Sequence, residues 1–304
     1  MRFNKLDLNL LVALDALLSA KNISRAADKI HLSQSAMSNA LARLRDYFGD
    51  ELLVQVGRNM ELTARAEGLV DAVRDVLVRI EATVEARPLF VPGESTRAFR
   101  LLISDYSLMT LMPKVTERAY AEAPGVRLGF VPQVAHPQRI LERGEADVLI
   151  IPREYCSADH PFEILFEETY CALIWKDSPL ARRELSQEAY VGAGHVVIQP
   201  GDGQPALDDW LIQRLGIARR VDVRTFTFLS PAYLLPGTNR IATVHRRLAQ
   251  QVLNSQPVVM REVPFQMPVM EQAMQWHTHR TTDPGITWLR QLLHECSSAL
   301  DAEQ

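Results

Sequence analysis

The chain has 304 residues, of which 47% are hydrophobic and 23% are charged, and this balance excludes a disordered chain and predicts a buried core. A formal net charge of -4 excludes a protein that attracts polyanions through bulk positive charge. The length is that of about two or three domains of ordinary size.

The sequence lacks the features of an exported or membrane-spanning chain. Asn9 and Asp15 interrupt the apolar stretch 8–18, so it is neither a long apolar span nor a signal-like segment. Three widely spaced cysteines do not suit a disulfide framework, and we expect them to be buried thiols. These features predict a cytoplasmic protein.

The stretch 23–49 predicts two short helices joined by a turn. Apolar residues recur at helical spacing in both halves, namely Ile23, Ala26, Ala27 and Ile30, then Met37, Leu41, Leu44 and Phe48. Ser33 follows the turn and is a suitable N-cap for the second helix. This spacing alone fits an ordinary amphipathic helix pair as well as a nucleic-acid reader.

The second helix carries polar side chains on its other face and flanks: Gln34, Ser35, Ser38, Asn39, Arg43 and Arg45. Short hydrogen-bonding side chains can meet base edges or phosphates in the major groove, and arginines can neutralise phosphate charge. Residues 1–65 carry nine Lys/Arg against seven Asp/Glu, whereas residues 88–304 carry twenty-one against twenty-five. Because this asymmetry is small, DNA affinity would come from the placement of these groups and from pairing two readers in a dimer.

Further motifs lie on both sides of the helix pair. They are an apolar helix over 6–19, the run AAxxIxLSQSAMSxAxxRLR, and ELLVQ at 51–55 followed by Gly57-Arg58 and Leu62-Thr63. Together they resemble the winged helix-turn-helix of LysR-type transcriptional regulators. That family usually has proline, phenylalanine and arginine where this chain has Ser35, Leu53 and Gln55, so Arg58 is the wing residue expected to contact phosphate. The resemblance implies that DNA is bound by Ser24, Ser33, Gln34, Ser35, Ser38, Asn39, Arg43 and Arg58.

The resemblance extends over nearly the whole chain, through ERGEADVLI, FEETYCALIW, GTNRIATVHRRLA and DPGITWLR. It is to the branch that contains the NodD regulators and the regulators of aromatic catabolism. It implies a winged helix-turn-helix over 1–64, a linker and dimerisation helix over 65–87, and an effector-binding regulatory domain over 88–304.

Residues 65–87 contain no proline and carry apolar residues four, three, four and three positions apart: Leu69, Val73, Val76 and Ile80, ending at Thr83. This spacing predicts a coiled-coil seam in which Val73 and Ile80 pack across a two-fold axis. A helix packed on its own domain is the alternative. Pro88, Pro92 and Gly93 then predict a hinge.

Beyond the hinge, short apolar strands alternate with helices. Strands are expected over 99–103, 126–131, 148–151, 170–175, 196–198, 221–223, 241–243 and 270–277, with helices over 108–121, 138–143, 207–215, 246–253 and 286–296. This rhythm predicts an α/β fold with mostly parallel sheets. By resemblance, it is a two-lobed domain like a periplasmic binding protein, with lobe 1 at about 95–166 plus 271–304 and lobe 2 at about 167–270.

A ligand is expected beyond the carboxyl ends of the strands, in a cleft between the lobes. The candidate lining residues are Ser104, Tyr106, Ser107, Pro132, His195, Phe226, Phe228 and Thr238. Hydroxyls and helix N-termini could hold a carboxylate or phenolate, and the aromatic rings could stack on a planar ligand. The alternative is that the rings belong to the core and the hydroxyls cap helices.

No nucleophile elbow, Gly-rich phosphate loop or metalloprotease motif is present. His277-x-His279 and Cys156 with His160 have no further ligands at a zinc-like spacing, and His245-Arg246-Arg247 is typical of a solvated helix start. We therefore expect no catalytic residue, metal or cofactor. The prediction is a regulator that binds double-stranded promoter DNA as a homo-oligomer, a dimer through the linker helix and then a tetramer, and responds to a small aromatic or phenolic co-inducer. The alternative is a solute-binding or transferase-like α/β protein.

Overall fold

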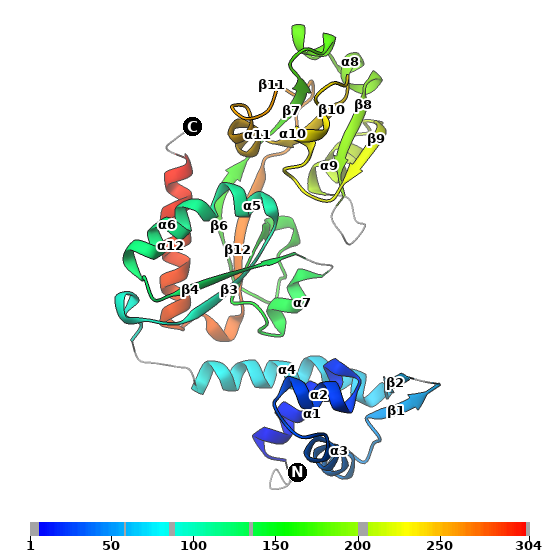
Figure 1. The fold of residues 1–304 in the computed structure, drawn as a ribbon, viewed down its shortest axis with the longest axis vertical. Coiled ribbons are helices and arrows are strands. Elements are labelled where there is room, and N and C mark those ends of the chain that lie inside the picture. The colour runs from blue at the N-terminus through cyan, green and yellow to red at the C-terminus, as the bar shows by residue number, and fades with distance from the viewer. Residues whose placement is uncertain (1–5, 58, 85–88, 134–135, 200–205, 302–304) are drawn as a thin grey trace. The chain divides into compact units, whose positions relative to one another are not determined.

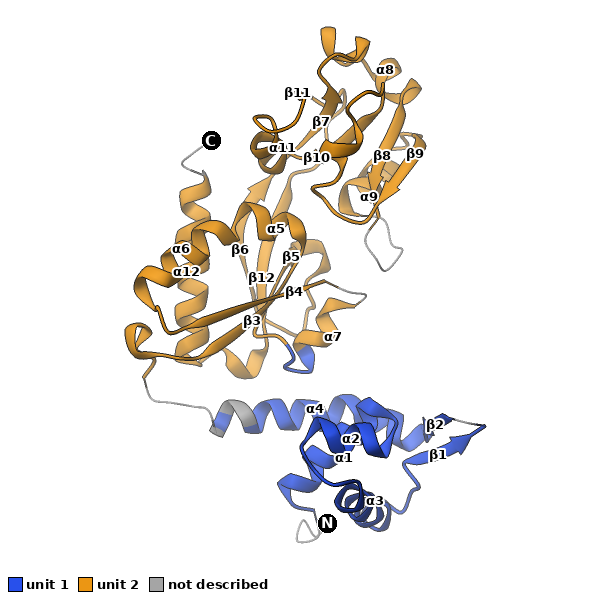
Figure 2. Ribbon diagram, viewed as in Figure 1, with its two compact units in different colours: residues 1–87, 142–145 blue, residues 88–141, 146–304 orange. Residues whose placement is uncertain are grey.

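The computed structural model describes residues 6–57, 59–84, 89–133, 136–199 and 206–301 (Figure 1). Contacts within the chain divide it into two compact units (Figure 2). Unit 1 is Met1–Arg87 with Glu142–Glu145, and unit 2 is Pro88–Leu141 with Ala146–Gln304. Among the described residues, we find no helix with the length and apolar character to cross a membrane.

Unit 1 contains four helices and one hairpin: α1 (Leu8–Ala20), α2 (Ile23–Lys29), α3 (Gln34–Phe48), β1 (Leu53–Val56), β2 (Asn59–Leu62) and α4 (Ala64–Val84). The side chains of Asp7, Asn22 and Ser33 accept hydrogen bonds from amides in the first turns of α1, α2 and α3. The predicted Ser33 cap is therefore confirmed. The predicted apolar stripe of α3 is also confirmed, since Met37, Leu41 and Leu44 are buried in the core of the unit.

Helix α4 packs on its own unit over part of its length. Val73 and Leu77 are buried in the same core as the apolar face of α3, and Leu69 packs against that core. The prediction that Val73 faces a partner subunit is therefore wrong, because this side chain is already covered within one chain. Val76 is 43% exposed and Ile80 is half-buried. The apolar surface of α4 that remains accessible is therefore formed by Val76 and Ile80 rather than by Val73.

Unit 2 holds two five-stranded sheets. The first has the strand order β4-β3-β5-β12-β6, built from β3 (Ala98–Ile103), β4 (Arg127–Pro132), β5 (Val148–Pro152), β6 (Phe162–Glu168) and β12 (Met270–Trp276). Its helices are α5 (Asp105–Thr110), α6 (Met112–Glu122), α7 (Pro137–Glu142) and α12 (Pro284–Asp301). We call the part built on this sheet lobe 1.

The second sheet has the strand order β11-β7-β10-β8-β9 and forms what we call lobe 2. Its strands are β7 (Tyr170–Trp175), β8 (Gly194–Ile198), β9 (Arg220–Thr225), β10 (Ile241–His245) and β11 (Val258–Arg261). Its helices are α8 (Gln187–Gly192), α9 (Leu207–Arg214), α10 (Pro231–Leu234) and α11 (Arg246–Val252).

The expectation of mostly parallel sheets is wrong in each lobe. β3 pairs in parallel with β4 and β5, but β12 is antiparallel to both β5 and β6. Likewise β8 is parallel to β9 and β10, whereas β7 is antiparallel to β10 and β11. The reason is the crossover: β7 and β12 enter their sheets directly from the other lobe, without the helical return that makes neighbouring strands parallel.

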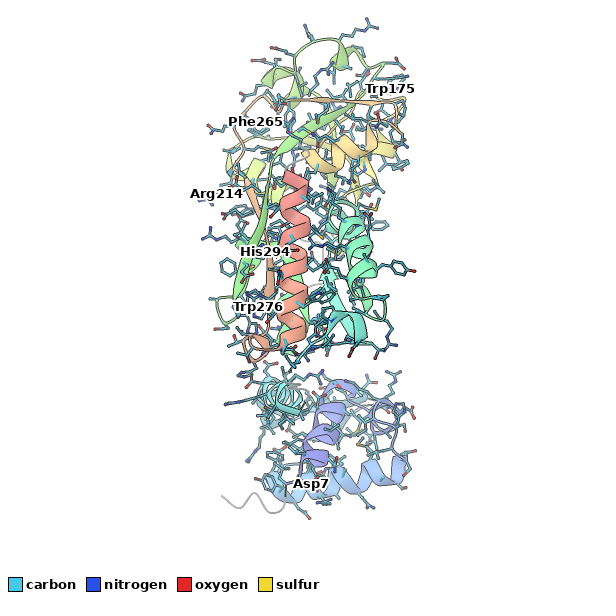
Figure 3. The ribbon with its side chains drawn as sticks, turned by 90° about the vertical axis from the view of Figure 1, so that its left-hand side faces the viewer. Asp7, Trp175, Arg214, Phe265, Trp276 and His294 are labelled. Atoms are coloured by element: carbon cyan, nitrogen blue, oxygen red, sulfur yellow. The ribbon has the colours of Figure 1, made fainter. Side chains whose placement is uncertain are left out.

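The C-terminal helix α12 packs against the sheet of lobe 1. His294 of α12 lies 2.8 Å from the Glu163 carboxylate of β6, and the Arg290 guanidinium lies over the ring of Trp276. Figure 3 shows His294 and Trp276 on this side of the molecule.

The helix expected over 108–121 is divided, since α5 ends at Thr110 and α6 starts at Met112, next to Pro113.

Candidate DNA-binding and effector sites

The polar side of α3 is free of contacts with the core of unit 1. Ser24 of α2, the N-cap Ser33, and Gln34, Ser35, Ser38, Asn39 and Arg43 of α3 are all exposed. Ser33 and Ser35 hydroxyls lie 3.0 Å apart, so they form one polar corner at the start of the helix. The candidate DNA-facing residues of both helices therefore lie on the surface. Arg58 lies outside the described residues.

The two arginines on the flank of α3 have different surroundings. Arg43 lies 3.3 Å from the Asp7 carboxylate, and both side chains are more than half exposed, so water can screen this pair and the arginine is available to a phosphate. Arg45 instead donates to the backbone oxygens of Glu51 and Leu53, at 2.8 and 3.0 Å. Arg45 therefore has backbone hydrogen-bond partners within unit 1.

In unit 2, helix α5 starts directly after β3 and reaches the other lobe. The Asp105 carboxylate accepts hydrogen bonds from the amides of Phe228 and Leu229, at 2.7 and 3.2 Å. Burial raises the pKa of Asp105, and the bonds from these two amides partly oppose that effect. Because Asp105 belongs to lobe 1 and Phe228 to the loop after β9, this carboxylate links the two lobes.

A group of side chains, all buried except the half-buried Phe228, continues this link, and we call it the junction cluster: Tyr106, Glu168, Tyr170, Phe228, His245 and Arg247. The Tyr106 hydroxyl donates to the Glu168 carboxylate, and Arg247 lies 3.6 Å from the same carboxylate. The Tyr106 ring lies 4.2 Å from the His245 ring and 6.3 Å from the Phe228 ring, between centroids. The cluster therefore joins α5 to the crossover strand β6 and to lobe 2.

The buried polar atoms that have no hydrogen-bond partner within the described part of the chain include Tyr170 Oη, Asp208 Oδ1, His245 Nδ1 and Gln272 Oε1. Burial lowers the pKa of His245 to about 3, so its imidazole is neutral. Burial also raises the pKa of Asp208 to about 7, and burial together with the Asp208 charge raises the pKa of Tyr170. An unpaired buried polar group costs about 1–3 kcal/mol, so these atoms would gain from a hydrogen-bonding ligand.

The structure brings several of the predicted effector residues together at the carboxyl end of β3. Ser104 caps α5 by accepting from the Ser107 amide, and the two hydroxyls lie 3.3 Å apart. Ser107 is fully buried and its hydroxyl accepts from the Gln272 side chain at 3.0 Å. Pro132 is exposed at the end of β4, where it pairs with Ile103, next to Ser104.

Two predicted residues lie at the wrong end of lobe 2. His195 pairs with Ile241 at the first residue of β10, whereas the junction cluster lies at the last residue, His245. His195 is fully buried, its Nε2 lies 2.8 Å from the Tyr190 carbonyl oxygen, and burial lowers its pKa to about 4. Thr238 precedes the start of β10 and hydrogen-bonds to Leu235 and Arg240 of its own turn. Neither side chain faces the junction.

Phe226 is also separated from the cluster, since 75% of its surface is exposed. Phe228, two residues later, is half-buried, packs against the cores of both lobes and lies 5.1 Å from the His245 ring. Only one of the two predicted stacking aromatics therefore contacts the junction cluster.

Comparisons with known proteins identify the family. The profile described as "Bacterial regulatory helix-turn-helix protein, lysR family" matches residues 8–67, and the "LysR substrate binding domain" matches residues 92–297. The chain belongs to the LysR family. The predicted fold class, a helix-turn-helix followed by an α/β substrate-binding domain, is confirmed.

Nodulation regulators are among the similar proteins of known sequence. "Nodulation protein D" of Bradyrhizobium sp. (strain ANU 289) is 40% identical over all of this chain and 90% of its own length. "Nodulation protein D 1" of Rhizobium meliloti (strain 1021) is also 40% identical, over all of this chain and 99% of its own length. This LysR protein is therefore a NodD-like transcriptional regulator rather than an enzyme.

Solved structures agree with this assignment. A probable transcriptional regulator from Pseudomonas aeruginosa is 29% identical, with a TM-score of 0.66 over 96% of this chain and 98% of its own. Full-length OxyR from the same species has a TM-score of 0.74 over 96% of this chain and 94% of its own, and at 18% identity it supports the fold alone.

Sequence reasoning missed most of the polar groups of the LysR sensor that meet at the junction. The run at 245–247 was expected to be solvated, but His245 and Arg247 are 5% and 7% exposed. They are buried because α11 starts where β10 reaches lobe 1. Their positions in the sequence could have indicated these groups, because Asp105, Glu168 and His245 each lie within two residues of one end of a predicted strand.

Proposed function

We propose that this LysR-type regulator binds promoter DNA as a homo-oligomer and responds to a small aromatic or phenolic molecule held between the lobes. We also propose the division into a DNA-binding domain over 1–64, a linker helix over 65–87 and an effector-binding domain over 88–304. The DNA-binding and linker parts fall in unit 1, and nearly all of the effector-binding part falls in unit 2.

The proposed DNA-contacting residues are Ser24, Ser33, Gln34, Ser35, Ser38, Asn39, Arg43 and Arg58. Support comes from the exposure of the described members of this set and from the polar corner formed by Ser33 and Ser35. Full-length CbnR in complex with its target DNA shares the fold, with a TM-score of 0.60 over 97% of this chain and 100% of its own at 14% identity. Short polar side chains at the start of a recognition helix suit base edges in the major groove.

The proposed dimer contact uses α4, with the face moved from Val73 to Val76 and Ile80. Val76 is 43% exposed, and an apolar side chain on a long helix gains by packing against a second copy. A tetramer made from two such dimers remains part of the proposal.

The observation that carries the effector proposal is the coincidence of aromatic rings and unpaired polar atoms at the junction. Phe228 and Tyr106 offer ring surfaces, and Tyr170 and His245 offer hydrogen-bonding atoms without partners among the described residues. A planar ring with polar substituents can stack on the former and hydrogen-bond to the latter. From the sequence-based set we keep Ser104, Tyr106, Ser107, Pro132 and Phe228, and we add Tyr170, Asp208 and His245.

The proposed mechanism is a shift in the population of lobe arrangements. A ligand that binds more tightly to one arrangement of the lobes shifts the equilibrium towards that arrangement. The free energy of this shift cannot exceed the difference between the ligand's binding free energies for the two arrangements. The altered sensor then changes how the oligomer binds DNA.

The test is a thermal-shift screen of the full chain over phenolics, flavonoids and aromatic acids, because a ligand of the native state raises its melting temperature. Any stabilising compound is then titrated into Phe228→Ala and into the matched control Phe226→Ala, which changes an exposed ring of the same type two residues away. We expect Phe228→Ala to lose the shift and Phe226→Ala to keep it. Equal shifts in both variants would place the ligand elsewhere.

A gel-shift assay on the DNA upstream of the chain's own gene tests the other half of the proposal. The expected result is a specific shift whose footprint spans more than one helical turn, because a dimer places two readers on successive half-sites. A shift equally well competed by unrelated DNA would contradict specific promoter binding.

A further inference from the structure

Arg45 connects the end of the reader helix to the start of the hairpin. It lies in the last turns of α3, and its Nε and Nη2 atoms donate to the carbonyl oxygens of Glu51 and Leu53. The Glu51 carboxylate lies 3.1 Å from the same Nε and balances the charge. The planar guanidinium therefore holds the segment that leads into β1 at two points, Glu51 and Leu53.

A second set of hydrogen bonds connects the same segment to α4. One oxygen of the Asp50 carboxylate accepts from the Leu52 amide at 2.7 Å and from the Thr63 hydroxyl at 2.6 Å. The Thr63 hydroxyl in turn accepts from the Ala66 amide at 3.1 Å, in the first turn of α4. Bonds to an ionised carboxylate are stronger than neutral ones, and these two bonds lower the pKa of Asp50.

Between these contacts, Leu52 has an unusual backbone conformation. Its φ of 60° lies in the left-handed region, which a leucine rarely adopts. Its amide is bound by Asp50, and its carbonyl oxygen accepts from the Thr63 amide at 3.1 Å. Such a conformation persists where surrounding bonds fix it on both sides. The root of the hairpin is therefore held to α3 and to α4, while Gln55, Val56 and Gly57 near its tip are exposed.

We propose that Arg45, Asp50 and Thr63 form a wing brace, a set of positioning residues that fixes the β1–β2 hairpin relative to α3 so that both reach one DNA duplex together. This inference rests on the proposed DNA contacts of α3 and the hairpin. Two contact sites held at the right separation bind without paying the entropy of aligning the second one. Figure 1 shows the hairpin extending from unit 1 at the end where α4 begins.

The brace makes a prediction that a direct phosphate contact by Arg45 would not make. A lysine keeps the positive charge but cannot donate to two carbonyl oxygens through a planar fork. Arg45→Lys should therefore behave like Arg45→Ala if the residue acts on the hairpin. If Arg45 instead binds phosphate, Arg45→Lys should keep most of the affinity and Arg45→Ala should lose it.

The experiment uses the full chain and a duplex selected from a random library by the parent protein. Hydroxyl-radical footprinting reports on backbone protection along the whole site, and dimethyl sulfate protection of guanine N7 reports on the major groove under α3. The variants are Arg45→Lys, Arg45→Ala and Thr63→Val, with Thr63→Ser restoring the hydroxyl. Arg79→Ala, an exposed arginine of α4 outside the brace, is the charge-matched control.

We expect Arg45→Lys, Arg45→Ala and Thr63→Val to lose the flanking backbone protection and about tenfold in affinity, the equivalent of one charged hydrogen bond, while keeping guanine protection. Thr63→Ser and Arg79→Ala should match the parent. The proposal would be overturned if Arg45→Lys kept the flanking backbone protection of the parent. It would also be overturned if Thr63→Val lost both the backbone and the guanine protection while its circular dichroism spectrum showed the helix content of the parent. If the parent itself selects no duplex, the DNA-binding proposal fails rather than the brace.

Discussion

The Asp105 carboxylate lies 2.7 Å from the amide nitrogen of Phe228, which is 123 residues further along the chain. The bond runs from the first turn of α5 in lobe 1 to the loop after β9 in lobe 2. It needs no ligand, so the chain itself supplies part of the free energy that holds the lobes together. A co-inducer would then add to an existing preference rather than create it.

Removing this acceptor should loosen the junction. Asp105→Ala leaves the amides of Phe228 and Leu229 without the carboxylate, and a hydrogen bond to a charged group contributes about 1.5–3 kcal/mol. We expect these two amides to exchange their hydrogens about tenfold faster or more in native-state hydrogen exchange. Glu117→Ala, which removes an exposed carboxylate of α6, is the control. Unchanged exchange at Phe228 would mean that other contacts alone hold the loop.

The two faces of α4 should respond differently to charge. Val76→Glu with Ile80→Glu should give a smaller species by analytical ultracentrifugation while unit 1 stays folded, because these side chains are proposed to meet a second copy. Val73→Glu should instead unfold unit 1, because the Val73 side chain is only 5% exposed and the substitution would place a carboxylate in the core. Arg79→Glu, on the same helix and exposed, controls for added negative charge. A parent-sized double variant would assign the oligomer contact to another surface.

The buried carboxyl of Asp208 should give unit 2 a distinctive dependence on pH. Its pKa is raised to about 7 from 3.8, so the folded state holds this proton more tightly than the unfolded chain. Stability is then greatest below the unfolded pKa and falls as the pH rises towards about 7. Asp208→Asn removes this loss, and its free energy of unfolding relative to the parent should rise by up to about 4 kcal/mol across that range.

Urea titrations followed by tryptophan fluorescence can measure this difference, because all four tryptophans lie in unit 2. Asp177→Asn, which changes an exposed carboxylate of lobe 2, is the matched control. A difference between Asp208→Asn and the parent that stays constant from about pH 4 to about pH 8 would show that Asp208 does not bind a proton in this interval.

Two residues of α3 should separate base reading from phosphate binding. Ser38→Ala should weaken binding to the selected duplex by about 1–3 kcal/mol and relax its base preference. Arg43→Ala should weaken binding to all sequences alike and lower the salt slope by about one. Competition assays at several salt concentrations distinguish these outcomes. If Arg43→Ala leaves the salt slope unchanged, its pairing with Asp7 persists on DNA and the residue is no phosphate contact.

The reader helix could be predicted from the sequence because its signals are local. The N-cap Ser33 and the spacing of Met37, Leu41 and Leu44 depend only on neighbours along one helix. Most strands of unit 2 were also predicted, since each is a short apolar run. The strands β6 and β11 were missed: glutamates interrupt the apolar residues of β6, and β11 is only four residues long.

The junction could not be predicted in the same way because it depends on which end of each strand meets the other lobe. His195 and His245 both belong to strands of one sheet, yet they mark opposite ends of it. Alternation along a strand gives the face of a side chain but not the end of the sheet that meets a partner layer. The burial of His245, Glu168 and Arg247 follows from crossovers between sheets, which local spacing does not encode.

The position of β12 has a consequence for synthesis of the protein. This strand lies between β5 and β6, although the chain reaches it only after completing every strand of lobe 2. As the polypeptide leaves the ribosome, lobe 2 can therefore pair all of its strands before the sheet of lobe 1 is complete, because β12 is the last of the strands to be synthesised. A product truncated before Met270 would carry two unpaired strand edges, at β5 and β6, which are sites for aggregation. Nascent chains of this length would thus depend on rapid completion of synthesis or on chaperones.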